Sequence, residues 1–230
     1  MTLSNKRIVM GGEGGQGVQA AADILAQAAY EEGKEALYIP NFGIEQRGGV
    51  SLAFVQVGEE PIGSPKFKYA HLIVALSGRS LERLQGYINE ESIILYDSSL
   101  LAPPQVSDEV IGWQCYDTIA PEAFAERRLT DQRQSFPEIT SKVKHIYGLP
   151  ASEMAQNKLH PRVANIIILG ATAGVMEIVQ LESTKKALET RLENKLKRDP
   201  ALKNLNFRAL ELGWEAAARM IKRPVSTGKI

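Results

Sequence analysis

The sequence predicts a three-layer α/β domain built on a mostly parallel sheet, with a buried helix late in the chain. Two observations support this fold class: short apolar runs typical of strands are separated by helical segments, and several of these runs lack the polar alternation of strands with one exposed face. The chain has 230 residues, of which 44% are hydrophobic and 23% charged. We therefore expect one domain over residues 1–230, long enough to enclose a substantial core.

The first half of the chain supplies most of the predicted strands. Lys6–Met10 reads as the first strand, and a helix follows from about Gly17 to Glu32. Gly33 suits the C-cap of that helix. A second strand, EALYIP, ends at Pro40. Apolar and polar residues alternate in SLAFVQVG, which predicts a third strand with one exposed face. The runs HLIVAL and SIILYD are typical of buried parallel strands, and the helical segment RSLERLQGYI lies between them. This succession indicates a Rossmann-like architecture with right-handed crossovers.

The second half is predicted to be mainly helical after a long irregular excursion at about 102–150, which has paired prolines and little periodicity. Pro161 suits the first turn of a helix whose body, RVANIIILGATAGVMEIV, is apolar almost all round and is therefore expected to be buried. Gly170 and Gly174 in this helix favour the close approach of another backbone. Two further segments follow. The first is charged with a solvated face, ESTKKALETRLENKLKR, and the second is predicted to be an amphipathic helix, FRALELGWEAAARMI.

Charge and cysteine content exclude several function classes. Lys plus Arg and Asp plus Glu balance at 27 each, so no bulk positive field favours nucleic acid or an anionic membrane as a partner. Cys115 is the single cysteine, which excludes an internal disulfide and an iron–sulfur cluster ligated within the chain. The three histidines lack metal-ligand spacing, so no metal site is expected. The segment MTLSNKRIVM does not read as a signal or transit peptide, and we expect a cytoplasmic protein.

The sequence Gly12-x-Gly14-x-x-Gly17 follows the first strand with the spacing of a dinucleotide-binding turn. Such glycines permit a tight turn, and the helix N-terminus behind them favours an anion. Two observations argue against NAD or FAD. The end of the second strand, YIPN, has no carboxylate for a ribose, and the charge of Glu13 inside the loop opposes a pyrophosphate. Two alternatives remain open: the glycines only allow strand and helix to pack closely, or the loop faces a ligand or a partner chain.

The stretch PNFGIEQRGGVSLAFVQVGEEPIGSP joins a Glu-x-Arg-Gly-Gly turn to an alternating strand and a Pro-Ile-x-Ser-Pro sequence. Together with GGEGGQGVQAAADILAQAA before it, and LIVAL, IILYDSSL and NIIILGATAGV after it, it resembles the gamma subunit of the 2-oxoacid:ferredoxin oxidoreductases. The resemblance covers about residues 7–101 and 149–217. The turn from Glu45 to Ser51 is similar to the 2-oxoglutarate branch, whereas the long segment at 102–150 departs from the family's shorter connection.

The resemblance implies an oxidative decarboxylation of a 2-oxoacid with coenzyme A to an acyl-CoA and CO2, with electrons passed to ferredoxin. In that family thiamine diphosphate, Mg²⁺ and iron–sulfur clusters lie on other subunits. We therefore expect this chain to hold no cofactor and no catalytic residue, and to be inactive alone. The implied partners are the thiamine-diphosphate-binding and pyrimidine-end subunits, with a ferredoxin-like subunit as a further candidate. Coenzyme A is expected at the shared site.

Two glycine-rich segments are candidates to face a partner or coenzyme A. Both follow strands at the carboxyl edge of the predicted sheet, where open α/β sheets bind ligands. Arg47 offers a fork of donors for a carboxylate or phosphate, although an ordinary turn between strands is the open alternative. Asp97, Ser98 and Ser99 end another strand at this edge and suit either a site or a helix cap. The candidate residues are Gly14, Gly15, Gln16, Gly17, Glu45, Arg47, Gly48 and Gly49.

Two alternative functions of the whole chain remain open: a free-standing NAD(P)-binding enzyme and a binding module that has lost its catalytic partners.

Overall fold

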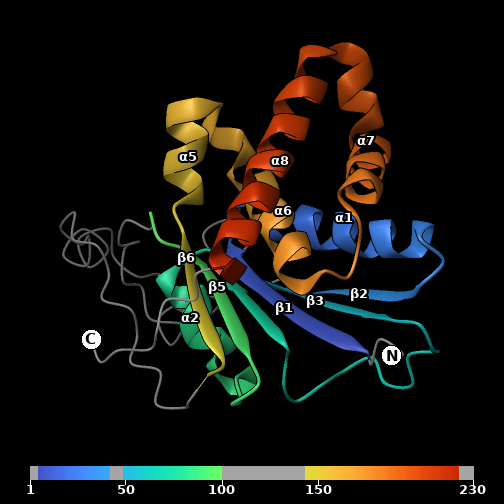
Figure 1. Cartoon of the computed structure of the whole chain (residues 1–230), viewed down its shortest axis with the longest axis vertical. Coiled ribbons are helices and arrows are strands. Elements are labelled where there is room, and N and C mark those ends of the chain that lie inside the picture. The colour runs from blue at the N-terminus through green and yellow to red at the C-terminus, as the bar shows by residue number, and fades with distance from the viewer. Residues whose placement is uncertain (1–4, 42–48, 100–142, 223–230) are drawn as a thin grey trace, which may run out of the picture.

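The computed structural model describes residues 5–41, 49–99 and 143–222, in which six strands form one sheet in the order β2-β3-β1-β4-β5-β6. The strands are β1 (Lys6–Glu13), β2 (Glu35–Asn41), β3 (Val50–Gly58), β4 (Leu72–Ala75), β5 (Ile93–Asp97) and β6 (His145–Leu149). The helices are α1 (Val18–Glu31), α2 (Gly78–Leu84), α5 (Ala151–Lys158), α6 (Ala164–Met176), α7 (Leu181–Arg198) and α8 (Ala201–Lys222), with 3-10 helices η1 (Gln85–Tyr87) and η2 (Pro161–Val163). Figure 1 shows α1, α6, α7 and α8 over one face of the sheet and α2 on the other, which confirms the predicted three-layer fold.

One strand of the sheet runs against the others. Strands β1, β4, β5 and β6 are parallel, whereas β3 is antiparallel to both of its neighbours, β1 and β2. The first residue of β3, Val50, is therefore paired with the last residue of β1, Glu13. The reversal brings the start of β3 to the carboxyl edge of the parallel strands.

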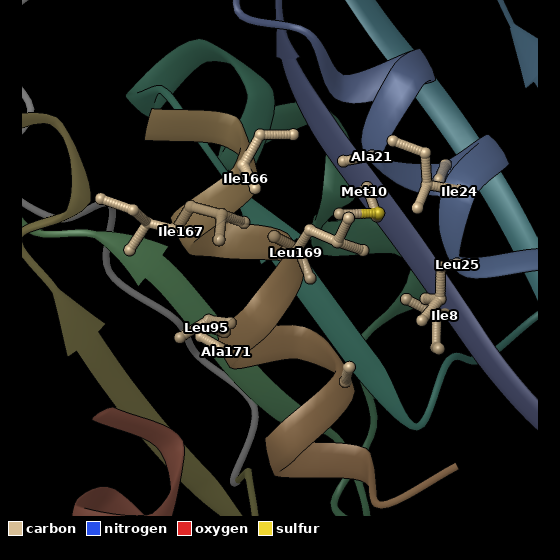
Figure 2. Packing of buried hydrophobic residues seen from close by; sticks show 14 of the residues in the cluster. Ile8, Met10, Ala21, Ile24, Leu25, Leu95, Ile166, Ile167, Leu169 and Ala171 are labelled. Carbon is tan, nitrogen blue, oxygen red and sulfur yellow. The ribbon is translucent and has the colours of Figure 1, made fainter. Parts of the chain in front are cut away.

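The sheet has an apolar core on each face because successive strand residues point to opposite sides. On the face that carries α1 and α6, Figure 2 shows Met10 of β1 between Ile24 and Leu169. On the face that carries α2, Val9 and Ile73 belong to a second buried cluster. All five side chains are almost completely buried.

Helix α6 is buried and crosses α8 at very close range. A Cβ atom on Gly170 would lie 2.1 Å from the carbonyl oxygen of Leu210, and one on Gly213 would lie 1.9 Å from the carbonyl oxygen of Ile167. Gly174, one turn further along α6, faces a side chain of α8 in the same way. The predicted close approach of another backbone to α6 is confirmed, and α8 supplies that backbone.

Several elements differ from the sequence prediction. Strand β1 continues past Met10 to Glu13, so Gly12 lies within the strand rather than after it, and helix α5 was not predicted. Strand β6 lies within the segment predicted to be irregular and pairs in parallel with β5 over all five of its residues. Helix α8 begins at Ala201 rather than near Phe207, and the Asp199 carboxylate accepts a hydrogen bond from the Ala201 N–H at 3.1 Å, which satisfies one of the free donors at the helix start. The remainder of the predicted excursion, including Cys115, lies outside the described residues.

Helix α7 is charged and is attached to its neighbours by ion pairs. Arg191 Nε lies 2.6 Å from Asp23 Oδ2 of α1, and Lys185 Nζ lies 3.1 Å from Glu211 Oε1 of α8. The predicted charged, solvated segment therefore packs along the outside of the helical layer. Within the described ranges, no helix has the length and apolar character needed to cross a membrane.

Candidate functional site

The two glycine-rich segments meet at the carboxyl edge of the sheet. The Gly14 N–H donates a hydrogen bond to the carbonyl oxygen of Gly49 at 3.0 Å. Gly15 and Gly17 have φ angles of 104° and 74°, which favour glycine. The structure thus brings together five of the candidate residues, Gly14, Gly15, Gln16, Gly17 and Gly49. The candidates Glu45, Arg47 and Gly48 lie outside the described residues.

Gln16 holds the glycine loop in place with both ends of its amide. Its Oε1 accepts a hydrogen bond from the Glu13 N–H at 2.7 Å, and its Nε2 donates to the carbonyl oxygen of Leu76 at 3.0 Å. Leu76 directly follows β4, so the Gln16 side chain links the ends of two neighbouring parallel strands. This role requires both a donor and an acceptor on one side chain, which a glutamine supplies.

A cavity of about 250 Å³ opens beside the glycine loop. Its polar lining comes from four segments that are distant in the sequence: Gln16, Asp97, Ser152, and Arg162 with Asn165. The volume is below the roughly 300–1,000 Å³ of pockets that enclose a whole drug-sized ligand. The cavity therefore suits one part of a larger ligand, or a group presented by another chain.

Asp97 lines this cavity and caps helix α5. The carboxylate is 3% exposed and accepts hydrogen bonds from Ser99 N–H at 3.1 Å, Ser152 N–H at 3.1 Å and Ser152 Oγ at 2.5 Å, and also from Ser99 Oγ. Ser99 Oγ in turn accepts from the Glu153 N–H at 3.2 Å. The N-terminus of α5 has no cap of its own, so β5 satisfies its donors from a neighbouring element. The helix-cap alternative for Asp97 is confirmed.

The start of α6 closes the other side of the cavity. Asn165 Nδ2 donates to the carbonyl oxygen of Gly17 at 3.4 Å, and a Cβ atom on Gly17 would lie 2.4 Å from that nitrogen. A Cβ atom at Gly17 would therefore displace the Asn165 side chain, and the positive φ angle of Gly17 also favours glycine. Arg162 is exposed beside the cavity and, within the part of the chain that the structure describes, forms no ion pair. Its guanidinium is available to an anionic group.

The glycine loop does not lie in the setting of a dinucleotide site. In a dinucleotide-binding sheet the second strand lies beside the first, so that its end reaches the ribose. Here β3 separates β1 from β2. In the described ranges, no cluster of three or more His, Cys, Asp or Glu side chains is arranged to hold a metal ion.

Sequence reasoning missed Ser152, Arg162 and Asn165 as lining residues. The available signal was Pro161, which begins η2, the 3-10 helix that carries Arg162 and leads into α6, where Asn165 lies. A helix that begins at the carboxyl edge of a sheet presents its first turn to any ligand there. Residues 102–150 were predicted to be irregular, so β6 was not predicted. This strand leads directly into α5, which carries Ser152.

Comparison with known proteins identifies the family. The model of the family described as pyruvate ferredoxin/flavodoxin oxidoreductase matches residues 7–216. Ketoisovalerate oxidoreductase subunit VorA of Methanothermobacter thermautotrophicus is 30% identical over 217 residues, which are 94% of this chain and 37% of that protein. The 2-oxoglutarate synthase subunit KorC of Methanocaldococcus jannaschii is 30% identical over 185 residues, which are 80% of this chain and 81% of that subunit.

Two solved structures share the fold. The gamma subunit of a keto/oxoacid ferredoxin oxidoreductase from Geobacter sulfurreducens has a TM-score of 0.64 and 24% identity, covering 93% of this chain and 99% of that one. The 2-oxoglutarate:ferredoxin oxidoreductase of Magnetococcus marinus, with 2-oxoglutarate, coenzyme A and succinyl-CoA bound, has a TM-score of 0.69 and 20% identity, covering 94% of this chain and 31% of that one. Together with the match to the family model, these findings show that the chain belongs to the pyruvate ferredoxin/flavodoxin oxidoreductase family.

Proposed function

We propose that this chain is the gamma subunit of a 2-oxoacid:ferredoxin oxidoreductase complex and forms the coenzyme A side of a site that other subunits complete. The complex would convert a 2-oxoacid and coenzyme A to an acyl-CoA and CO2, with electrons passed to ferredoxin. Family membership supports the assignment, as does the likeness to a solved gamma subunit over 99% of its length. The thiamine-diphosphate-binding and pyrimidine-end subunits would be the partners.

The observation that carries the coenzyme A assignment is the cavity beside the glycine loop. It is about 250 Å³, too small for a whole coenzyme A, and has Arg162 beside it. One end of the cofactor would enter the cavity while its phosphates remain outside, within reach of a guanidinium. Arg47 would supply a second cation, since it is two residues before Gly49, which contacts the glycine loop.

The chemistry itself would belong to the partner subunits. Thiamine diphosphate with Mg²⁺ would cleave the bond to the carboxyl group, and iron–sulfur clusters would carry the electrons. This chain has a single cysteine, too few to hold a cluster. Relatives named for ketoisovalerate and for 2-oxoglutarate match with the same 30% identity, so the 2-oxoglutarate branch stays a prediction from the turn at Glu45 to Ser51.

The test is a coenzyme A titration of the assembled complex. Arg162→Ala removes a charge-assisted contact and should raise the Michaelis constant for coenzyme A by about 10-fold, with kcat little changed. Arg47→Ala should have the same effect or weaken assembly. Arg198→Ala is the matched control, because Arg198 is exposed at the far end of α7. Unchanged coenzyme A kinetics in both variants would contradict the assignment of this edge, and saturable binding of NADH to the isolated chain would favour the alternative NAD(P) enzyme.

A further inference from the structure

The glycine loop carries a carboxylate, that of Glu13, which has no counter-charge among the described residues. Glu13 ends β1, and its Oε1 is shielded from solvent with no hydrogen-bond partner. No ion pair among the described residues includes Glu13. Glu31 also has a shielded oxygen without a hydrogen bond, but that oxygen lies 3.3 Å from Lys186 Nζ. Glu13 as a whole is partly exposed, but an oxygen that is shielded from water is unfavourable without a hydrogen-bond donor or an opposite charge, and the described residues supply neither to Oε1.

The main chain on both sides holds Glu13 in position. Its N–H donates to Gln16 Oε1 at 2.7 Å, and its carbonyl oxygen accepts from the Gln16 N–H at 3.0 Å. The next residue, Gly14, is tied to Gly49. The carboxylate is therefore carried by a fixed loop rather than by a freely moving one, which lowers the entropy cost of binding a partner group.

The loop beside Glu13 leaves room for a second chain. Gly14 and Gly15 are exposed, and a Cβ atom on Gly15 would meet no other atom within 4 Å. Glycines without side chains let another backbone come close. The negative charge of Glu13 repels a phosphate at this place and attracts a cation.

We propose that Glu13 binds an arginine or lysine side chain of a partner subunit, so that the glycine loop is a docking point for a cation rather than a phosphate-binding turn. The inference rests on the proposed function, since it requires a partner chain. A guanidinium or ammonium group supplies both the charge and the donors that the shielded Oε1 lacks. The proposal assigns to Glu13 a role in assembly, separate from the cavity on the β4 side of the loop.

The test compares Glu13→Gln with Glu59→Gln in the assembled complex. Both variants remove one negative charge and keep the shape of the side chain. Glu59 is exposed and directly follows β3, whose end lies at the opposite edge of the sheet, beside the start of β1. We expect Glu13→Gln to weaken the binding of this chain to its partner subunits by about 10-fold and to make dissociation less sensitive to NaCl, as loss of an interface ion pair does. Glu59→Gln should assemble like the wild type, with gel filtration over a salt series as the measurement.

Four results separate the outcomes. If the wild-type chain does not assemble with these subunits, both the proposed function and the inference fail. If it assembles and Glu13→Gln binds equally well, the inference alone is overturned. A fall in the thermal midpoint of the isolated Glu13→Gln chain, absent from Glu59→Gln, would show that the carboxylate already has a cation within the chain and would overturn it too. Tighter binding of ADP by isolated Glu13→Gln than by the wild type would identify the loop as an anion site and refute the docking role.

Discussion

Replacing Gly213 by alanine tests the close crossing of α6 and α8. The new Cβ would lie 1.9 Å from the carbonyl oxygen of Ile167, whereas ordinary contact begins at 3.4 Å. The two helices must therefore separate by about 1.5 Å, the difference between these distances. Both clashing groups are attached to helical backbone, so neither can rotate away. Overpacking and the lost contacts should cost about 3–5 kcal/mol, and the better helix propensity of alanine offsets about 1 kcal/mol.

The net loss of about 2–4 kcal/mol corresponds to a fall in Tm of roughly 5–15 °C for a chain of this size. Circular dichroism of the full chain during heating measures it. Gly86→Ala is the matched control, because a Cβ atom there meets nothing within 4 Å and its φ is not positive. We expect that control to change stability by less than about 1 kcal/mol. A Gly213→Ala protein that melts at the wild-type temperature would refute the backbone clash.

Two further predictions concern the histidine His71 and the Asp97 carboxylate that caps α5. Burial, with the nearby charges of Arg7 and Lys6, lowers the pKa of His71 to about 4. The unfolded chain, with a histidine pKa of about 6.5, therefore binds the proton more readily, and the free energy of unfolding should fall by about 1–2 kcal/mol between pH 6.5 and 4, allowing for the partly exposed ring. Urea unfolding of His71→Asn should show a smaller fall with pH, and an identical pH dependence would contradict this. For Asp97→Asn, the amide nitrogen cannot accept the serine donors, so stability should fall by about 1–3 kcal/mol. Amide hydrogen exchange in the variant should be faster than in the wild type in α5 and unchanged in α7. If variant and wild type exchange at the same rate in α5, Asp97 does not cap this helix.

Much of the fold could be predicted because its signals are local. The apolar body of α6 indicated burial, and Gly170 and Gly174 indicated a close helix contact. The partner Gly213 was not predicted, because a glycine in an amphipathic helix does not reveal which helix it meets. Strand β6 was missed because HIYGL is short and contains a glycine, so its strand character comes from pairing with β5 rather than from its own pattern.

The site was predictable only where it coincides with a sequence motif. The glycine loop and Gly49, which contact each other in the structure, could be predicted because their glycines and strand ends are visible in the sequence. The cavity was not, because Asp97, Ser152 and Arg162 meet only through the order of the parallel strands. The sequence placed the charge of Glu13 in the glycine loop, but it did not show that one oxygen of the carboxylate is shielded without a hydrogen-bond partner.

The antiparallel strand β3 has a consequence for how such chains can diverge. Since β2 and β3 are adjacent and antiparallel, like the strands of a hairpin, Asn41 and Val50 lie at the same edge of the sheet. Residues can be added to or removed from a hairpin connection while the paired register of its strands is kept. We therefore expect this connection to vary in length and charge among related chains, and so to change what they recognise, on a sheet that stays the same.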